Sequence, residues 1–581
     1  MRKLPCWVLV VAWAAGCGGS GGTAADPGPL DLAYDVAFGD TAQDGTAGDA
    51  EERDLPADTI VPDLPGDPAV DEGAEAAQDA AQGDDTPAGD AAGDPSLLDP
   101  AGDPAVDPAD DPGADGPLDV AADVLGDAAD LPPDAFEEPW TSLFDPARIR
   151  DASTAECLFT NPHTAIKDGV LLDVWNVSYR SWESIDGQLQ PILIRGFAAR
   201  PQVASVPLPG VVQAHGLGGM SEEAHATGTA ALLGTFAIAY TGPGGGNKPD
   251  NTSEGRPAGY EDGYRMFDTL ADPRGSWFWG HAVAGLRGLT CLAMRDDVDA
   301  TRLGMTGFSA GGVVTLIGAA VDDRVKAAVP LSACGAWDVA TQSPKAWQHE
   351  LLAKAGLTTA SPEWTALLDH LDSARLLPAT AAQVLMVNGS ADEFFPLTAH
   401  VATFDAIPGD AKRTAVAGNF DHGCFQLTSI EDKEDVEIRA SDAAKGGQRM
   451  WFRHVFGTDA DYGYVPLAPA NVTFAQALPG AWIAGAVVDG GGSRLDVKEV
   501  RLWASTDAKL WFSLELVSKG NGLYATKANE FVPQDPATLA WYVDAAYKTK
   551  DLVLPETFSI STRPSLPAGF VPDIRGITSC W

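Results

Sequence analysis

Ser309 is the residue of this 581-residue chain whose surroundings point most directly to chemistry. It lies at the centre of Gly307-Phe308-Ser309-Ala310-Gly311, and the residues on either side favour a strand before it and a helix after it. A serine on such a sharp turn has a strained backbone, so the positions two before and two after it must lack side chains. Free backbone N–H groups at a helix N-terminus also favour a developing negative charge. Ser309 is therefore the candidate nucleophile, although a simple small-residue turn is the alternative.

The residues around this turn extend the pattern in both directions. The stretch 299–312 reads D-x-x-R-L-G-x-x-G-x-S-x-G-G, and an earlier apolar stretch, 210–214, ends in His215-Gly216-Leu217-Gly218-Gly219. Together they resemble the branch of α/β-hydrolases that holds acetyl xylan esterases, dienelactone-hydrolase-like enzymes and the catalytic domains of prolyl oligopeptidases. The resemblance covers roughly residues 171–456. It implies an α/β fold, a mostly parallel sheet with helices on both faces.

The resemblance also assigns the two backbone donors that would stabilise an oxyanion. In these enzymes one donor follows the nucleophile and the other comes from the glycine-rich loop, which implies Ala310 and Leu217. His215 stands at the start of that loop. We expect its side chain to orient the loop and not to transfer a proton.

An acid and a base are also required, and α/β-hydrolases supply them in the chain order Ser, acid, His. A buried strand expected at 384–389 leads into Ser390-Ala391-Asp392-Glu393, where the family pattern G-x-x-D-x-x-x-P places the acid on Asp392. Glu393 is the alternative. The strand expected at 414–417 leads to His422, where these enzymes carry the base. Taken alone, Asp392 could be a loop cap and His422 a surface histidine.

Ser309, Asp392 and His422 in this order predict a serine hydrolase that cleaves carboxylic esters through an acyl-enzyme. We expect a small-molecule or carbohydrate ester with a short acyl group as substrate, and no cofactor. A prolyl-oligopeptidase-like peptidase is the alternative among enzymes, but the sequence before the hydrolase segment does not resemble the propeller that such enzymes carry. Outside enzymes, the alternative is a non-catalytic cell-surface binding protein on the same fold.

The first 140 residues differ sharply in composition from the rest. They hold 33 of the 82 acidic residues and only Arg2, Lys3 and Arg53 of the 38 basic ones. A segment with few aromatics, frequent Pro and high like charge cannot bury enough apolar surface to offset its chain entropy, so we expect a disordered tether at 17–139. The Asp repeats of this segment contain no D-x-D-x-D-G loop, so we do not expect them to bind calcium. The net charge of −44 argues against nucleic acid as a partner.

The N-terminal residues read as an export signal. A short basic start is followed by an apolar run from Leu4 to Ala15 and then by Cys17. This stretch resembles the bacterial lipoprotein signal, which implies a signal peptide at 1–16 and a membrane anchor through lipid on Cys17. Gly18 after it implies the outer membrane or cell surface. Because Ala14 stands where these signals usually carry Leu, a periplasmic or secreted protein is the alternative.

The residues from Trp140 to Trp581 are too many for one typical domain. We expect the hydrolase domain at 140–460 and a small β-sandwich-like domain at 468–581, with a hairpin turn at Lys519-Gly520-Asn521-Gly522. The second domain could be a structural appendage or a carbohydrate-binding module. Five cysteines follow Cys17, so at least one of these five is unpaired within the chain. Because no C-x-x-C or H-E-x-x-H spacing occurs, we expect no metal site.

Overall fold

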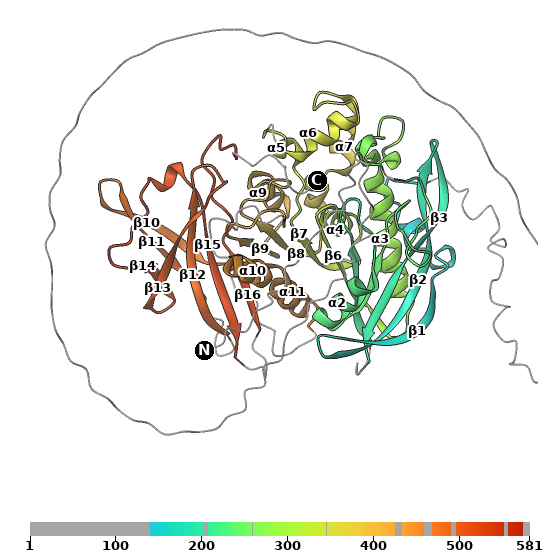
Figure 1. Ribbon diagram of the computed structural model, residues 1–581, viewed down its shortest axis with the longest axis horizontal. Helices are drawn as coiled ribbons and strands as arrows, with labels where there is room; N and C mark the ends of the chain where they lie inside the picture. The colour runs from blue at the N-terminus through green and yellow to red at the C-terminus, as the bar shows by residue number, and fades with distance from the viewer. Residues whose placement is uncertain are drawn as a thin grey trace, which may run out of the picture. The chain divides into compact units, whose positions relative to one another are not determined.

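The structure, a computed structural model, describes residues 140–202, 207–257, 259–343, 346–423, 433–457, 468–489, 495–550 and 556–572 (Figure 1). The expected signal peptide, Cys17 and the tether lie outside these residues, as do Cys424 and Cys580. Within the described part, none of the helices combines the length and the apolar character needed to cross a bilayer.

Six parallel strands form the centre of the sheet, in the order β5-β4-β6-β7-β8-β9. They are β4 (Leu208–Ala214), β5 (Phe236–Tyr240), β6 (Val298–Phe308), β7 (Val325–Leu331), β8 (Gln383–Gly389) and β9 (Lys412–Ala417). Nearly all residues of β5, β7 and β8 are buried. Parallel strands that are covered on both faces consist of apolar runs for this reason. The expected α/β fold with a mostly parallel sheet is confirmed.

Three antiparallel strands extend one side of the parallel centre. They are β1 (Leu158–Lys167), β2 (Val170–Ile185) and β3 (Gln188–Pro201), and β3 pairs with β5. The turn between β2 and β3 falls on Asp186 and Gly187, which have φ values of 52° and 76°. Both central residues are left-handed, as a type I′ hairpin requires, and Asp-Gly is a typical sequence for such a turn.

Helices cover both faces of the sheet. On one face lie α3 (Trp277–Ala293) and α4 (Ala310–Val321), and on the other lie α2 (Glu223–Leu233) and α11 (Gly447–Phe456) (Figure 1). Neighbouring residues of β4 show the division, because Val212 belongs to the core beneath α3 and α4 whereas Val211 belongs to the core beneath α11. Alternate side chains of a strand point to opposite faces, so an all-apolar strand serves both cores.

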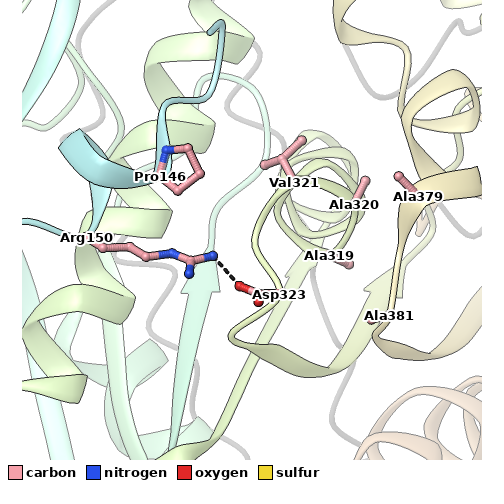
Figure 2. A pocket seen from close by; sticks show the side chains of 8 residues that line it. All are labelled: Pro146, Arg150, Ala319, Ala320, Val321, Asp323, Ala379 and Ala381. Atoms are coloured by element: carbon pink, nitrogen blue, oxygen red, sulfur yellow. Dashed lines mark hydrogen bonds and ion pairs between the residues drawn. The ribbon is translucent and has the colours of Figure 1, made fainter. Parts of the chain in front are cut away.

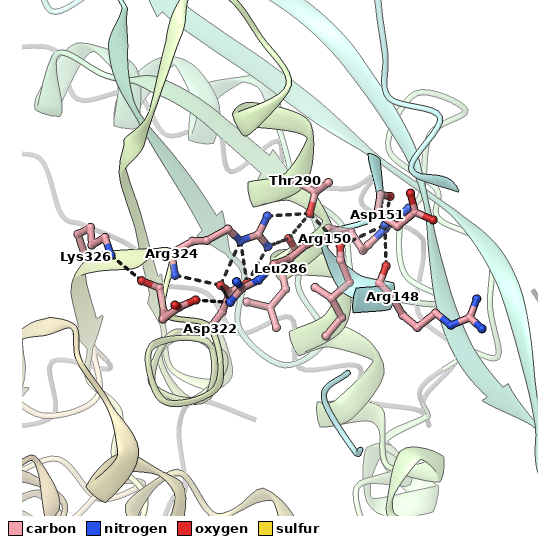
Figure 3. Close-up of polar contacts among 11 residues, drawn as sticks. Arg148, Arg150, Asp151, Leu286, Thr290, Asp322, Arg324 and Lys326 are labelled. Atoms are coloured by element: carbon pink, nitrogen blue, oxygen red, sulfur yellow. Dashed lines mark hydrogen bonds and ion pairs between the residues drawn. The ribbon is translucent and has the colours of Figure 1, made fainter. Parts of the chain in front are cut away.

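The C-terminal end of α4 is fixed by a polar cluster (Figure 3). The buried carboxylate of Asp322 accepts hydrogen bonds from Arg324 and from Arg150 at 2.8 Å. Arg324 also donates to Thr290 on α3 at 3.0 Å. These contacts tie the segment before β1 and helix α3 to the end of α4. The helix that carries Ser309 at its start is thus held at its far end as well.

Four short helices lie between β7 and β8. They are α5 (Trp337–Ala340), α6 (Trp347–Lys354), α7 (Pro362–Leu371) and α8 (Ser373–Leu376). Three buried tryptophans hold them together: Trp337 packs against Trp347 and Trp364 with ring centroids 5.7 and 6.2 Å apart. Trp347 then packs on Phe395, next to the candidate acid, at 5.7 Å. This helical insertion therefore reaches the site.

The C-terminal segment is built of strands, as expected. They are β10 (Ala470–Leu478), β11 (Ala481–Val487), β12 (Leu495–Ser505), β13 (Phe512–Gly520), β14 (Leu523–Thr526), β15 (Ala540–Thr549) and β16 (Thr557–Ser561). β13 pairs with both β12 and β14, and buried residues of β11 and β12 such as Ala486 and Leu502 share one core, which gives the sandwich-like arrangement. β16 also pairs with β9, so these strands continue the hydrolase sheet. The expected domain limits, 140–460 and 468–581, stay a prediction.

The described cysteines fall into two kinds. Cys157, just before β1, forms a disulfide with Cys291 on α3. Cys334 is a buried free thiol, and burial raises its pKa well above the ordinary value. The disulfide fixes the start of the antiparallel strands to the helix that covers the sheet.

Candidate active site

Ser309 occupies the sharp turn between β6 and α4. Its backbone angles are φ 57° and ψ −123°, a conformation that a non-glycine residue adopts only when its surroundings enforce it. A Cβ added to Gly307 would lie 2.5 Å from the Gly311 carbonyl oxygen, and one added to Gly311 would lie 2.1 Å from that of Ala214. The amide of Ser309 donates to the Leu331 carbonyl at 2.9 Å. This crowding explains why positions 307 and 311 are glycines.

His422 lies directly beside Ser309, in the loop that follows β9. Its Nε2 is 3.0 Å from the Ser309 Oγ, and its Nδ1 is 3.0 Å from Oδ2 of Asp392. The side chains of His422 and Asp392 are buried, and Ser309 is 9% exposed. An imidazole with its proton on Nδ1 donates to the carboxylate and accepts the serine hydroxyl proton at Nε2. The three residues chosen from the sequence are thus brought into one hydrogen-bonded line.

Aromatic rings enclose the imidazole of His422. The ring centroids of Phe394, Phe308 and Phe395 lie 4.3, 4.8 and 5.6 Å from it. Phe308 comes from the nucleophile turn and the other two from the loop after β8. The rings restrict the imidazole and keep water from its faces, which strengthens its polar contacts.

Asp392 is held by its own loop after β8. Its Oδ1 accepts the backbone N–H groups of Phe394 and Phe395, each at 2.9 Å, and its side chain is fully buried. The carbonyl oxygens of the same two phenylalanines accept hydrogen bonds from the side-chain amides of Gln348 and Asn388, at 3.1 and 3.0 Å. Both amides were missed in the sequence: Gln348 lies 46 residues from its partner, and nothing around Asn388 marks its side chain as a donor to the loop that follows it.

Glu393, the alternative acid, faces the main chain of His422 and not its ring. Its Oε2 accepts the His422 backbone N–H at 3.1 Å, while its Oε1 is buried without a hydrogen-bond partner. Burial, together with the nearby carboxylates of Asp392 and Asp421, raises the pKa of Glu393 well above its ordinary value. A raised pKa disfavours the carboxylate form, which is the form that stabilises an imidazolium. The geometry therefore favours Asp392 over Glu393 as the partner of the imidazole.

The two candidate oxyanion donors lie on either side of Ser309. Ala310 is the first residue of α4, so its N–H has no partner within the helix. On the other side, a Cβ added to Gly216 would lie 3.5 Å from the Ser309 Cβ, which places the loop of Leu217 against Ser309. The assignment of both N–H groups to an oxyanion stays a prediction.

Residues 173–433, which include all of these side chains, match the model of the acetyl xylan esterase family, AXE1. The chain is a carboxylic ester hydrolase of the α/β-hydrolase type. Solved structures with a similar fold include the acetyl xylan esterase from Paenibacillus sp. R4, at 18% identity and a TM-score of 0.40 over 53% of this chain and 99% of that one.

Two further structures are similar to this esterase over about half of its length. Acetyl xylan esterase 1 from Thermoanaerobacterium sp. JW/SL YS485 is 17% identical, with a TM-score of 0.39 over 50% of this chain and 91% of that one. Est1E from Butyrivibrio proteoclasticus, solved with ferulic acid bound, is 19% identical, with a TM-score of 0.29 over 48% and 97%.

His215 of the esterase contacts backbone groups. Its Nδ1 donates to the Gly216 carbonyl at 2.7 Å, and its Nε2 accepts the Gly242 N–H at 2.8 Å. Burial lowers the pKa of His215 to about 4, so the ring is neutral at neutral pH. The imidazole therefore joins the glycine-rich loop after β4 to the loop after β5. This is the arrangement expected of a residue that orients the loop.

A cavity of about 370 Å³ lies at the other end of α4 (Figure 2). Its lining includes Arg150, Asp323 and the last helical residues 319–321. Since α4 begins at Ala310 and rises about 1.5 Å per residue, this cavity is roughly 15 Å from Ser309. It therefore takes no part in the esterase site. Within the described ranges, no group of three or more His, Cys, Asp or Glu side chains could hold a metal ion.

Proposed function

We propose that the protein removes acetyl groups from acetylated carbohydrate through a Ser309-His422-Asp392 triad. The observation that carries this proposal is the unbroken hydrogen-bonded line from the Ser309 hydroxyl through the His422 ring to the Asp392 carboxylate. The match of residues 173–433 to the acetyl xylan esterase family supports the acetyl ester as substrate class.

Acylation begins when the Ser309 Oγ attacks the ester carbonyl carbon and its proton passes to the His422 Nε2. Asp392 accepts the Nδ1–H throughout, which keeps the imidazole in the required tautomer and stabilises its positive charge. The carbonyl oxygen becomes an oxyanion and accepts the N–H groups of Leu217 and Ala310. Collapse of this intermediate expels the sugar alkoxide, which takes the proton from Nε2, and leaves an acetyl-enzyme.

Deacylation repeats these steps with water as the nucleophile. His422 takes a proton from the water as its oxygen attacks the acetyl carbonyl, and the same two amides hold the second oxyanion. The Ser309 oxygen then leaves and recovers its proton from Nε2, while acetic acid is released. Neither half of the cycle needs a metal or a cofactor.

The test is hydrolysis of acetylated xylan and of a p-nitrophenyl ester series by the full chain and by Ser309→Ala. We expect acetate release and faster turnover of acetate than of long acyl esters, all lost in the variant. A prolyl-peptide anilide run beside them addresses the peptidase alternative. Turnover of the anilide with none of the esters would contradict the proposal.

We propose further that Cys17 carries a lipid that anchors the enzyme to the outer membrane or cell surface. The basic start, the apolar run and the small residues before Cys17 support this. A lipidated protein incorporates labelled palmitate and fractionates with membranes, and Cys17→Ser abolishes both. Secretion of unlabelled wild-type protein would favour the alternative location.

A further inference from the structure

The turn between β12 and β13 carries the C-terminal segment into the catalytic loops. Trp511, at its end, is 4% exposed, and Asn419, in the loop of His422, is 5% exposed. The two residues are 92 positions apart and exchange two hydrogen bonds. The Trp511 N–H donates to the Asn419 Oδ1 at 2.9 Å, and the Asn419 Nδ2 donates to the Trp511 carbonyl at 2.8 Å. The side chain of Asn419 therefore pairs with the main chain of Trp511 as a neighbouring strand would.

The indole of Trp511 reaches the loop of the acid. Its Nε1–H donates to the Ser390 carbonyl at 3.0 Å, two residues before Asp392. The Ser390 hydroxyl in turn accepts the Asn419 N–H at 2.8 Å. Asn419 has a φ of 54°, a left-handed conformation that asparagine tolerates better than most residues. Trp511 thus contacts the acid loop and the histidine loop at once, and these two loops also contact each other.

An apolar cluster surrounds the contact between Trp511 and the two loops. It joins Trp511 to Trp503 and Tyr542 of the C-terminal strands and to Val416 and Leu397 of the hydrolase. A Cβ added to Gly418 would lie 2.3 Å from the Trp503 ring, so the indole packs directly on the backbone of the histidine loop. The C-terminal strands therefore form part of the wall behind the two catalytic loops.

We propose that Trp511 and Asn419 are positioning residues, which make the C-terminal β-segment a working part of the active site. This inference rests on the proposed function. The contacts fix the acid loop and the histidine loop relative to each other, at points two and three residues from the side chains that must align with Ser309. A displacement of about 1 Å can reduce a rate about 100-fold, so small movements of these loops matter. Both residues are almost fully buried, so we expect neither to contact the substrate.

The inference predicts a change in kcat without a matching change in KM. Trp511→Phe keeps most of the ring but removes the Nε1–H, and Asn419→Ala removes both side-chain hydrogen bonds from the other side. We expect each to lower kcat for p-nitrophenyl acetate by about 10- to 100-fold, with KM within about threefold of wild type. The rate of fluorophosphonate labelling should fall in parallel. The number of reactive serines per molecule, measured by titration, should stay the same, because we expect both variants to remain folded.

Trp541→Phe is the matched control. Trp541 lies on β15 and packs against Phe474, with ring centroids 5.0 Å apart, within the C-terminal strands. The control should keep wild-type kcat, KM and labelling rate. Thermal unfolding of all four full-length proteins separates a loss of fold from a loss of alignment.

Three outcomes are decisive. A fall in kcat of Trp511→Phe and Asn419→Ala per titrated serine, with the control unchanged, supports the inference. Wild-type activity per titrated serine in both variants overturns it while leaving the proposed function intact. A folded wild-type protein that neither turns over esters nor reacts with fluorophosphonate refutes the proposed function, and this inference with it.

Discussion

The main-chain N–H of His422 donates to the Glu393 carboxyl at 3.1 Å, while its ring donates to Asp392, the preceding residue in the chain. Two adjacent carboxyl groups thus hold one histidine at two different places. The Asp392 carboxylate, which contacts the ring, is fixed by two backbone amides, whereas the Glu393 carboxyl has one oxygen without a hydrogen-bond partner. The difference gives the two residues different chemistry.

Asp392→Asn and Glu393→Gln should differ strongly in activity. The first leaves the shape of the site but loses the charge and the tautomer control, so we expect kcat to fall about 1,000-fold or more. The second replaces the carboxyl by an amide that still offers an oxygen to the His422 N–H, and it leaves the contacts of the His422 ring unchanged, so kcat should stay within about threefold. Steady-state kinetics of the two variants with p-nitrophenyl acetate decide this. Equal losses in both would show that the two carboxyls share the role.

Glu393 should also make stability depend on pH. Because its pKa in the folded state lies well above the ordinary 4.5, the folded protein retains a proton that the unfolded chain releases. The stabilisation is fully present below about pH 4.5 and is lost as the pH rises through the folded-state pKa. Glu393→Gln does not titrate, so its melting temperature relative to wild type should rise between pH 5 and pH 9. A difference that stays constant across this range would mean that Glu393 is ionised in the folded protein.

His215 should affect the rate but not the pH profile. Its ring joins the glycine-rich loop to Gly242, so His215→Ala should loosen the Leu217 amide and lower kcat about 10- to 100-fold. Burial lowers its pKa to about 4, so the ring stays neutral from pH 5 upward. The midpoint of the acid limb of kcat/KM should therefore be the same in the variant. A shifted midpoint would indicate that His215 exchanges protons in the reaction.

Two glycine substitutions, one in the crowded turn at Ser309 and one on α2, should have opposite effects on stability. In Gly311→Ala the added Cβ would lie 2.1 Å from the Ala214 carbonyl oxygen, so we expect a loss of about 1–3 kcal/mol in unfolding free energy and a lower kcat. Gly228→Ala, within α2, meets nothing within 4 Å and should raise the unfolding free energy by about 0.5–1 kcal/mol. Urea unfolding of both variants measures these changes. Equal stability of the two would contradict the assigned turn geometry.

The candidate catalytic residues could be chosen from the sequence because each follows an expected strand, in the chain order Ser, acid, His that the resemblance implies. Ser309 is marked by its flanking glycines, and Asp392 and His422 each stand a few residues after an apolar run. Local patterns of this kind depend on residues that are close in the chain. The hydrogen-bonded line among the three is a consequence of parallel strands ending at one edge of the sheet.

The supporting contacts could not be predicted, because they join residues distant in the chain. Trp511 lies 121 residues from the Ser390 carbonyl that its indole contacts, and Gln348 lies 46 residues from Phe394. A single Trp or Gln carries no local sign of such a partner. The pairing of β16 with β9 was missed for the same reason, since strand neighbours are set by tertiary packing.

The most direct test of the central claim is fluorophosphonate labelling of the full chain beside Ser309→Ala and His422→Ala, with acetate release measured on the same samples. The account predicts one label per wild-type molecule, located on Ser309, and loss of both labelling and acetate release in each variant. Labelling on another residue, or acetate release by Ser309→Ala at the wild-type rate, would contradict it.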